Sequence, residues 1–449
     1  MKDSMRITYL TAGAAGMFCG SCMNDNAVAK ELIKAGHDCV LMPVYTPIRT
    51  DVEDMSVDRV FLGGVNVYLS QKIPLIRYLP RWIVGWLDHP WVIKALTSKA
   101  GKTSPELLGQ LAISMLDGLE GNQKQEFEDL LRFLQTSIRP EKVLLTNLLI
   151  GGVIPQMASN ADVWVMLQGD DIFLDSLSVS HRAQAVERMR RLVASAKGFI
   201  CHSQAYAQSM QSLLGIPESK MHVVPLGVAT EDFIDRSASR SKLRRDDQLI
   251  RLGYLARMAP EKGLHLLVDA FIELRRHKKF SDVRLSMAGW MGPQHAMYWK
   301  EQQAKLHRAG LDGQWSYAGT VDRAEKVAFL ESLDLFCVPT TYADPKGIFL
   351  LEAVASGLPY VMPEHGAFPE LHRRITKSAD GAAIGQLYPQ GAFEGLVMAL
   401  EKALEKALES VQERSVKREP ASPLVLAELD IAMHTKRLVA VLQGKSSFD

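Results

Sequence analysis

The sequence predicts an α/β protein built from two Rossmann-like domains. Apolar runs of strand length alternate with helical segments along both halves of the chain, which is the pattern of parallel sheets covered by helices. The chain has 449 residues, more than one hydrophobic core usually serves, and this length suits two domains of ordinary size. Glycine-containing loops follow several strands, and open α/β sheets bind their ligands at such loops.

The composition is that of a folded, water-soluble protein with a small-molecule ligand. It is 47% hydrophobic and 23% charged, and the formal net charge of +1 gives no bulk electrostatic reason to expect a nucleic-acid partner. No apolar stretch reaches the ~18 residues of a membrane helix, and the first ten residues lead into a strand without a secretory signal. The five cysteines are widely spread and suit a reducing compartment, so we expect a cytoplasmic protein.

The first strand is expected at Arg6 to Leu10, followed by a glycine-rich turn, a helix over about 24–35 and a second strand over 39–45. The turn lies at the carboxyl end of the strand, where ligands bind. It contains Cys19 and Cys22 in a lone CxxC. Small residues in a tight loop explain this pair, a redox role is the alternative, and no second pair fits a zinc site.

A tryptophan-rich segment follows over about 61–99, with Trp82, Trp86 and Trp91 among prolines. It is either an irregular insertion with its own small core, an acceptor surface with aromatics against sugar faces, or a patch at about 75–95 that touches a membrane interface. A helical run over 105–136 comes next.

Two acidic residues, Asp170 and Asp171, follow the buried strand that begins near Ala161. They are candidates to bind acceptor hydroxyls, and equally a helix N-cap and a first-turn acid. We do not expect a metal there, because adjacent side chains point in different directions.

In the second half, Arg257 and Lys262 flank the turn between a strand ending near Leu255 and a helix. Two cations at a strand's carboxyl end can hold a diphosphate, and the alternative is a pair of solvated charges.

The stretch Pro339 to Leu371 is the most informative. A strand, a loop containing Asp344 and Gly347, and a helix starting at Ile348 together form a site suited to an anion. The helix is apolar almost all round and therefore buried, with Glu352 in its middle. Such a carboxylate is either bonded by neighbouring groups or held for ligand hydroxyls.

These residues resemble the signature of the retaining glycosyltransferases of family four. Asp344, seven residues and Glu352, with Gly347 between them and Gly357-Leu358-Pro359 after them, carry the resemblance. The family usually has Glu where Asp344 stands, and Lys346 and Ala367 are further departures. The pattern Arg257, four residues, Lys262-Gly263 also matches.

The resemblance implies the GT-B fold, in which two Rossmann-like domains face each other across a cleft. The hinge near Pro225 to Gly227 places the first, acceptor-side domain at 1–225, with glycogen-synthase-like character and an insertion at about 61–140. The second, nucleotide-sugar-binding domain is expected at 226–423. The last helix, 424–449, is expected to pack back on the first domain.

The resemblance also implies transfer of a sugar from a nucleoside diphosphate to an acceptor hydroxyl with retention of configuration. We expect no metal or cofactor, because cations and a helix N-terminus can hold the diphosphate and no cluster of metal ligands is visible in the sequence. Arg257 and Lys262 would stabilise the leaving diphosphate, which then helps to deprotonate the acceptor. Glu352 would bind the ribose and Asp344 the sugar. The other expected donor contacts are Gly16, Gly20, Thr320, Val321, Gly347 and Ile348. The expected acceptor contacts are Gln168, Asp170 and Asp171, with Gln168 standing where the family often has His.

Two other functions remain open. Asp344, Lys346 and Gln168 are compatible with a catalytically weakened nucleotide-sugar-binding protein, and a GT-B epimerase or phosphorylase would share the fold. The sequence does not indicate the base, the sugar, or whether the acceptor is a carbohydrate or lipid-linked.

Overall fold

The computed structural model describes residues 4–13, 20–48, 53–57, 105–234, 249–378, 385–412 and 422–445. The chain divides into two compact units, Met1–Val224 with Arg437–Asp449, and Pro225–Lys436. The tryptophan-rich segment 61–99 lies outside the described residues, as do Gly16 and Cys19, so the interpretations of these parts stay predictions.

Unit 1 contains a parallel sheet of six strands in the order β2-β1-β3-β4-β5-β6. Its strands are β1 (Arg6–Thr11), β2 (Asp38–Pro43), β3 (Lys142–Leu145), β4 (Asp162–Met166), β5 (Gly198–Cys201) and β6 (Met221–Val223). The central strands are buried along most of their length, which explains their continuous apolar sequences. The strand order reverses between β1 and β3.

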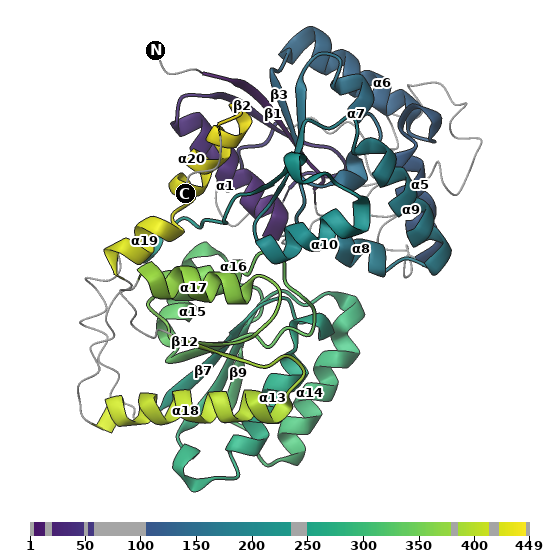
Figure 1. Ribbon diagram of the computed structural model, residues 1–449. Helices are drawn as coiled ribbons and strands as arrows, with labels where there is room; N and C mark the ends of the chain where they lie inside the picture. Colours follow the sequence, from purple (N-terminus) through teal and green to yellow (C-terminus); the bar gives the residue numbers. More distant parts are fainter. Residues whose placement is uncertain are drawn as a thin grey trace. The chain divides into compact units, whose positions relative to one another are not determined.

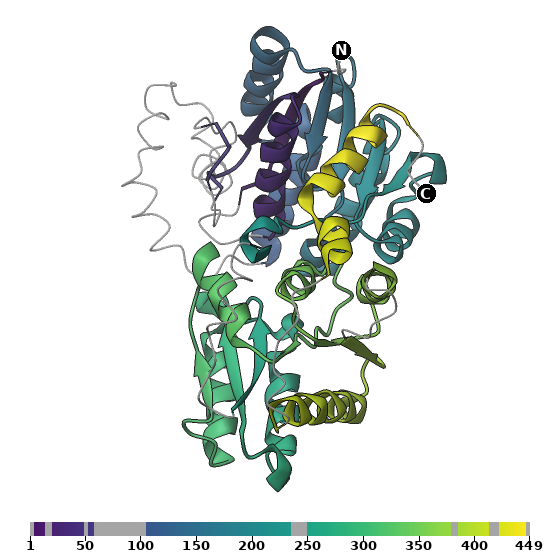
Figure 2. The ribbon, with the colours of Figure 1, turned by 90° about the vertical axis from the view of Figure 1, so that its left-hand side faces the viewer.

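The helices of unit 1 connect these strands. They are α1 (Gly20–Lys34), α5 (Pro105–Leu116), α6 (Lys124–Phe133), α7 (Ile154–Met157), α8 (Asp170–Asp175), α9 (Val179–Leu192) and α10 (Gln204–Leu214), with short turns at Gly118–Glu120, Leu134–Ile138, Leu148–Ile150 and Glu218–Lys220. Helix α1 packs on β1 and β2, as Figure 2 shows in purple. Helix α10 begins after the N-cap Ser203, whose side chain accepts the N–H of Tyr206.

Unit 2 contains a second parallel sheet of six strands, in the order β12-β11-β10-β7-β8-β9. Its strands are β7 (Ile250–Leu255), β8 (Val283–Ala288), β9 (Trp315–Tyr317), β10 (Leu335–Cys337), β11 (Tyr360–Pro363) and β12 (Gly385–Tyr388). Here the order reverses between β7 and β10. Loops that leave adjacent strands at such a point diverge to opposite faces of the sheet, and ligands bind between them.

The helices of unit 2 cover both faces of this sheet. They are α11 (Glu231–Ile234), α13 (Leu264–Leu274), α14 (Ala296–Arg308), α15 (Arg323–Ser332), α16 (Ile348–Ala355), α17 (Phe368–Ser378) and α18 (Phe393–Gln412), with short turns at Pro260–Lys262, Lys278–Phe280 and Pro293–His295. Figure 1 shows α15, α16 and α17 on one side of the sheet, and α13 and α18 on the other.

The C-terminal segment differs from the single helix expected over 424–449. It forms α19 (Pro423–Leu429) and α20 (Ile431–Leu442), separated at Asp430. Asp430 is extended because its neighbours exchange backbone hydrogen bonds with Val228, and its side chain accepts the N–H of Ala432. Helix α19 contacts α16 and α17 of unit 2, and only the part from Arg437 onward is grouped with unit 1.

Candidate functional site

The candidate site lies at the reversal point of the unit 2 sheet, in the loops that follow β7 and β10. Arg257 and Lys262 come from the first loop, and Asp344 and Gly347 from the second. Gly263 lets the two loops meet: its φ is +73°, and a Cβ on it would lie 1.7 Å from the carbonyl oxygen of Pro339. The sequence Lys262-Gly263 therefore places a lysine directly beside the loop after β10.

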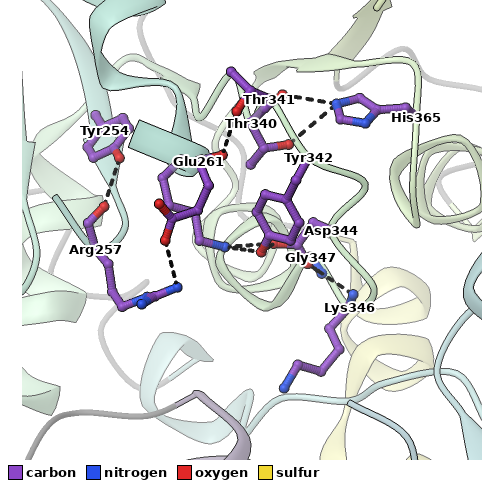
Figure 3. Close-up of polar contacts among 11 residues, drawn as sticks. Tyr254, Arg257, Glu261, Thr340, Thr341, Tyr342, Asp344, Lys346, Gly347 and His365 are labelled. Carbon is purple, nitrogen blue, oxygen red and sulfur yellow. Dashed lines mark hydrogen bonds and ion pairs between the residues drawn. The ribbon is translucent and has the colours of Figure 1, made fainter. Parts of the chain in front are cut away.

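Lys262 is part of a triangle of hydrogen bonds with Tyr342 and Asp344 (Figure 3). Its Nζ donates to the Tyr342 hydroxyl at 2.6 Å and to Asp344 Oδ2 at 2.8 Å. The Tyr342 hydroxyl donates to the same Oδ2 at 2.7 Å. Lys262 is only 8% exposed and Asp344 4%, so this is a buried ion pair with a hydroxyl inserted beside it. The sequence predicted both charged residues for the site, but not Tyr342.

The other oxygen of Asp344 fixes the loop before α16. Oδ1 accepts the N–H of Lys346 at 3.0 Å and that of Gly347 at 2.8 Å, and Gly347 takes a left-handed φ of 62° as the N-cap of α16. Burial alone would raise the pKa of Asp344, but the Lys262 ammonium and these N–H donors hold it well below its usual range. Contact of Asp344 with a sugar hydroxyl, the role expected from the sequence, would require one of these bonds to be exchanged.

Arg257 differs from Lys262 in its exposure. Its guanidinium pairs with Glu261 Oε1 at 3.0 Å, its side chain is 42% exposed, and its carbonyl oxygen accepts the Tyr254 hydroxyl at 3.0 Å. Figure 3 shows the side chains of Arg257 and Lys346 extending to the same side of the two loops. A half-exposed guanidinium held at its backbone can turn toward a ligand phosphate at little energetic cost.

Glu352 is a buried carboxylate on α16, 6% exposed, and it is paired with two cations of α15. Its Oε1 accepts Lys326 Nζ at 2.8 Å and an Arg323 nitrogen at 3.2 Å. These contacts stabilise the charge inside unit 2 and leave Oε2 outside the hydrogen bonds formed with the described residues. Sequence reasoning missed both cations, although their i, i+3 spacing after the helix N-cap places them on one face of α15.

The remaining donor-side candidates lie around the starts of helices. Thr320 is exposed and Val321 half-buried, immediately before Asp322, the N-cap of α15 in a capping box with Glu325. Ile348 is the first residue of α16, so its N–H belongs to the free N-terminal turn of that helix. Gly20 is the first residue of α1 in unit 1.

The acceptor candidates of unit 1 lie at the carboxyl end of β4, and each is engaged by the chain itself. Asp170, 2% exposed, accepts the N–H of Leu148 at 2.8 Å and that of Gln168 at 3.3 Å, and burial raises its pKa to about 7. Asp171 accepts the Tyr206 hydroxyl at 2.7 Å, and burial raises its pKa as well. Both are in the first turn of α8, so the expectation of a first-turn acid is confirmed, whereas the expected N-cap is wrong because Gly169 occupies that position.

Gln168 belongs to a buried network around Asp25 that the sequence did not reveal. Asp25 is fully buried on α1 and accepts hydrogen bonds from Tyr9 at 2.5 Å, Thr11 at 2.8 Å and Gln168 Nε2 at 2.9 Å. Burial raises its pKa. The polar run Asn24-Asp25-Asn26, buried in a helix, was the available signal, since buried polar side chains imply specific partners. The network ties α1 to the loop after β4.

The structure also bears on the expectations about metal sites, membrane helices and the CxxC pair. Among the described residues, no three His, Cys, Asp or Glu side chains come together as a metal site would require. In the same ranges, no helix is long and apolar enough to cross a membrane. Cys22 is buried and forms no disulfide with a described residue, and its CxxC partner lies outside the described residues.

Comparisons with known proteins bear on both the fold and the site. Residues 250–406 match the model of the family described as "Glycosyl transferases group 1", which confirms the resemblance for the part of the chain that contains Arg257, Lys262, Asp344 and Glu352. The rest of the chain is outside this match.

Curated relatives align with this chain over segments of similar length to the family match. A phosphatidyl-myo-inositol mannosyltransferase of Mycobacterium leprae is 32% identical over 31% of this chain and 33% of its own. A mannosylfructose-phosphate synthase of Agrobacterium fabrum is 27% identical over 34% of each chain. The chain thus spans about a third of the length of these curated relatives.

Solved structures extend the likeness to the whole chain. The sucrose-phosphate synthase of Thermosynechococcus elongatus has a TM-score of 0.64 at 16% identity and covers 98% of this chain and 99% of its own. HepE of Anabaena, solved with UDP and glucose, has a TM-score of 0.60 at 17% identity, with coverage of 98% and 99%. At these identities the likeness establishes the fold, and the GT-B fold expected from the sequence is confirmed.

Proposed function

We propose that this protein is a glycosyltransferase that moves a sugar from a nucleoside diphosphate to an acceptor hydroxyl with retention of configuration. The observation that carries the proposal is the reversal point of the unit 2 sheet, where Lys262 is paired with Asp344 in the loop before α16 and Arg257 lies in the same loop as Lys262, after β7. Cations and helix N–H groups at such a point suit a diphosphate, and they act most strongly on charge that develops as it leaves.

Each group has a distinct task in this reaction. Arg257 and Lys262 neutralise the departing diphosphate, together with the N–H group of Ile348 in the first turn of α16. Glu352 takes the ribose hydroxyls through Oε2, while Arg323 and Lys326 keep its charge in place. The leaving phosphate receives the acceptor proton on the same face of the sugar, so no protein carboxylate has to act as a nucleophile.

The identity of the donor and acceptor is suggested by the relatives. One aligned relative, from Mycobacterium tuberculosis, is described as a GDP-mannose-dependent mannosyltransferase acting on a phosphatidylinositol monomannoside. We therefore place GDP-mannose first among the donors to be tested, and a polyol or lipid-linked sugar first among the acceptors. We expect the protein to act in the cytoplasm and to transfer sugar without an added metal ion.

The test is a thermal-shift panel of GDP, UDP, ADP and TDP, followed by assay of the matching sugar nucleotide. A nucleotide at ~100 times its dissociation constant stabilises the protein by about 2.7 kcal/mol. Release of nucleoside diphosphate from a donor supports transfer or hydrolysis.

A second candidate is a nucleotide-sugar-binding protein with weakened catalysis. The observation in its favour is that both oxygens of Asp344 are bonded within the protein. Such a protein would be stabilised by a nucleoside diphosphate and would release none from any donor.

A further inference from the structure

The hydroxyl of Tyr342 occupies an unusual place in the candidate site. It accepts a hydrogen bond from Lys262 Nζ at 2.6 Å and donates one to Asp344 Oδ2 at 2.7 Å, while lysine and aspartate also meet directly at 2.8 Å. Tyr342 thus touches both members of a buried ion pair. Burial and the adjacent Asp344 charge raise the pKa of Tyr342, so its hydroxyl keeps its proton and remains a donor.

The carboxylate of Asp344 is fully used by the chain itself. A carboxylate offers about four acceptor positions. Oδ2 takes the Lys262 and Tyr342 donors, and Oδ1 takes the N–H groups of Lys346 and Gly347. A ligand hydroxyl would have to displace one of these donors. The geometry therefore favours a positioning role for Asp344, which fixes the loop and the lysine.

The ammonium of Lys262 is held in place, and one of its N–H donors remains available for a ligand. Of its three N–H donors, the bonds to Tyr342 and Asp344 account for two. The rings of Tyr342 and Phe349 lie 4.8 and 5.1 Å from Nζ and limit the directions in which the ammonium can turn. The third N–H is therefore aimed by the first two.

We propose that Tyr342 is a positioning residue, whose hydroxyl aims the third N–H of Lys262 at the diphosphate of the donor. This inference rests on the proposed function. The hydroxyl adds a second hydrogen bond to the direct contact of Lys262 with Asp344, so the ammonium is held from two directions. Tyr342, Lys262 and Asp344 then form one unit, in which the length of the acidic side chain and the presence of the hydroxyl are matched.

This matching gives an unusual expectation for paired substitutions. Glutamate is longer than aspartate by one carbon–carbon bond, about 1.5 Å. In Asp344→Glu the longer side chain collides with the Tyr342 hydroxyl and displaces Lys262. In Tyr342→Phe the hydroxyl is gone and Lys262 loses one partner. In the double variant the glutamate occupies the space that the hydroxyl leaves and keeps the direct contact with Lys262 that the aspartate makes in the wild type.

The experiment is a double-mutant cycle of Tyr342→Phe and Asp344→Glu, with kcat, donor KM and Tm measured for all four proteins. We expect each single variant to lose about 10- to 100-fold in kcat, as misplacement by roughly an ångström can do. The KM for the sugar nucleotide should change much less, because a misaimed Lys262 N–H mainly weakens the stabilisation of charge that develops during the reaction. The double variant should recover kcat above both singles. Tyr360→Phe, which removes a buried hydroxyl bonded to His372 at 2.9 Å, is the matched control and should keep wild-type kcat.

Three results would overturn the inference. Wild-type kcat in Tyr342→Phe would mean that the hydroxyl does not orient Lys262 for the reaction. A double variant whose loss is the product of the single losses would mean that the two positions are not matched. Equal losses in Tyr342→Phe and Tyr360→Phe would indicate a general effect of losing a buried hydrogen bond. An inactive wild-type protein would instead refute the proposed function, on which this inference depends.

Discussion

Replacement of Arg257 by alanine should separate catalysis from stability. The guanidinium is 42% exposed and its partner Glu261 31%, so their ion pair is a surface interaction worth about 0–1 kcal/mol. Arg257→Ala should therefore unfold at nearly the wild-type temperature. If Arg257 contacts the leaving diphosphate, the same change removes a charged hydrogen bond in the transition state.

The loss of that bond should cost about 2–4 kcal/mol, which corresponds to roughly a 30- to 1,000-fold drop in kcat/KM. The assay is the steady-state release of nucleoside diphosphate from the donor, with binding of the nucleoside diphosphate measured alongside. Both quantities should fall in Arg257→Ala, with the Tm almost unchanged.

Glu261→Ala is the matched control, because it breaks the same ion pair and keeps the arginine. It should retain near-wild-type kcat/KM. Lys262→Ala provides the contrast: it leaves the buried Asp344 carboxylate without its cation and should lower stability by about 3–5 kcal/mol as well as activity. Wild-type turnover in Arg257→Ala, or an equal loss in Glu261→Ala, would refute the role assigned to Arg257.

Three further predictions follow from the same groups and from the sequence. Activity should persist in EDTA, since the diphosphate is assigned to cations and helix N–H groups; complete loss that Mg²⁺ or Mn²⁺ restores would contradict this. Asp170 has a folded pKa of about 7, above its unfolded value, so its folded state retains a proton that the unfolded state loses. The Tm of the wild type relative to Asp170→Asn should thus fall as pH rises from about 4 to about 8, and a constant difference would show that Asp170 does not titrate in this range. If the tryptophan-rich segment meets a membrane, anionic liposomes at low salt should bind the protein and Trp86→Ser should weaken binding, whereas no binding would favour a packed insertion.

Much of the fold was readable from the sequence because its strands are buried on both faces. Such strands appear as short apolar runs, as in β4 and β10, and their alternation with helices indicates a parallel sheet. The order of the strands was not readable from composition or spacing. The expectation of one C-terminal helix failed at Asp430, where pairing with Val228, 202 positions earlier in the chain, interrupts the helix.

The site was readable where its residues follow strands directly. Arg257, Lys262 and Asp344 became candidates from the loops after two strands, and Glu352 from its place in an apolar helix, together with the family resemblance. The structure brings Lys262 and Asp344 into contact. Tyr342 was missed because its contact depends on how two loops fold against each other, 80 residues apart in sequence. Asp25 was missed because its partners come from β1 and the loop after β4. Contacts of this kind follow from tertiary packing, which local sequence patterns do not encode.

The most direct test of sugar transfer with retention is to follow the purified protein by NMR with α-linked sugar nucleotides, GDP-mannose first and UDP-glucose and ADP-glucose after it. Transfer with retention predicts that one donor is consumed, that nucleoside diphosphate appears, and that the product, or the free sugar formed by slow hydrolysis, is first seen as the α anomer. Arg257→Ala should slow this reaction. First appearance of the β anomer would contradict retention, and tight binding of a nucleoside diphosphate without turnover of any donor would contradict transfer itself.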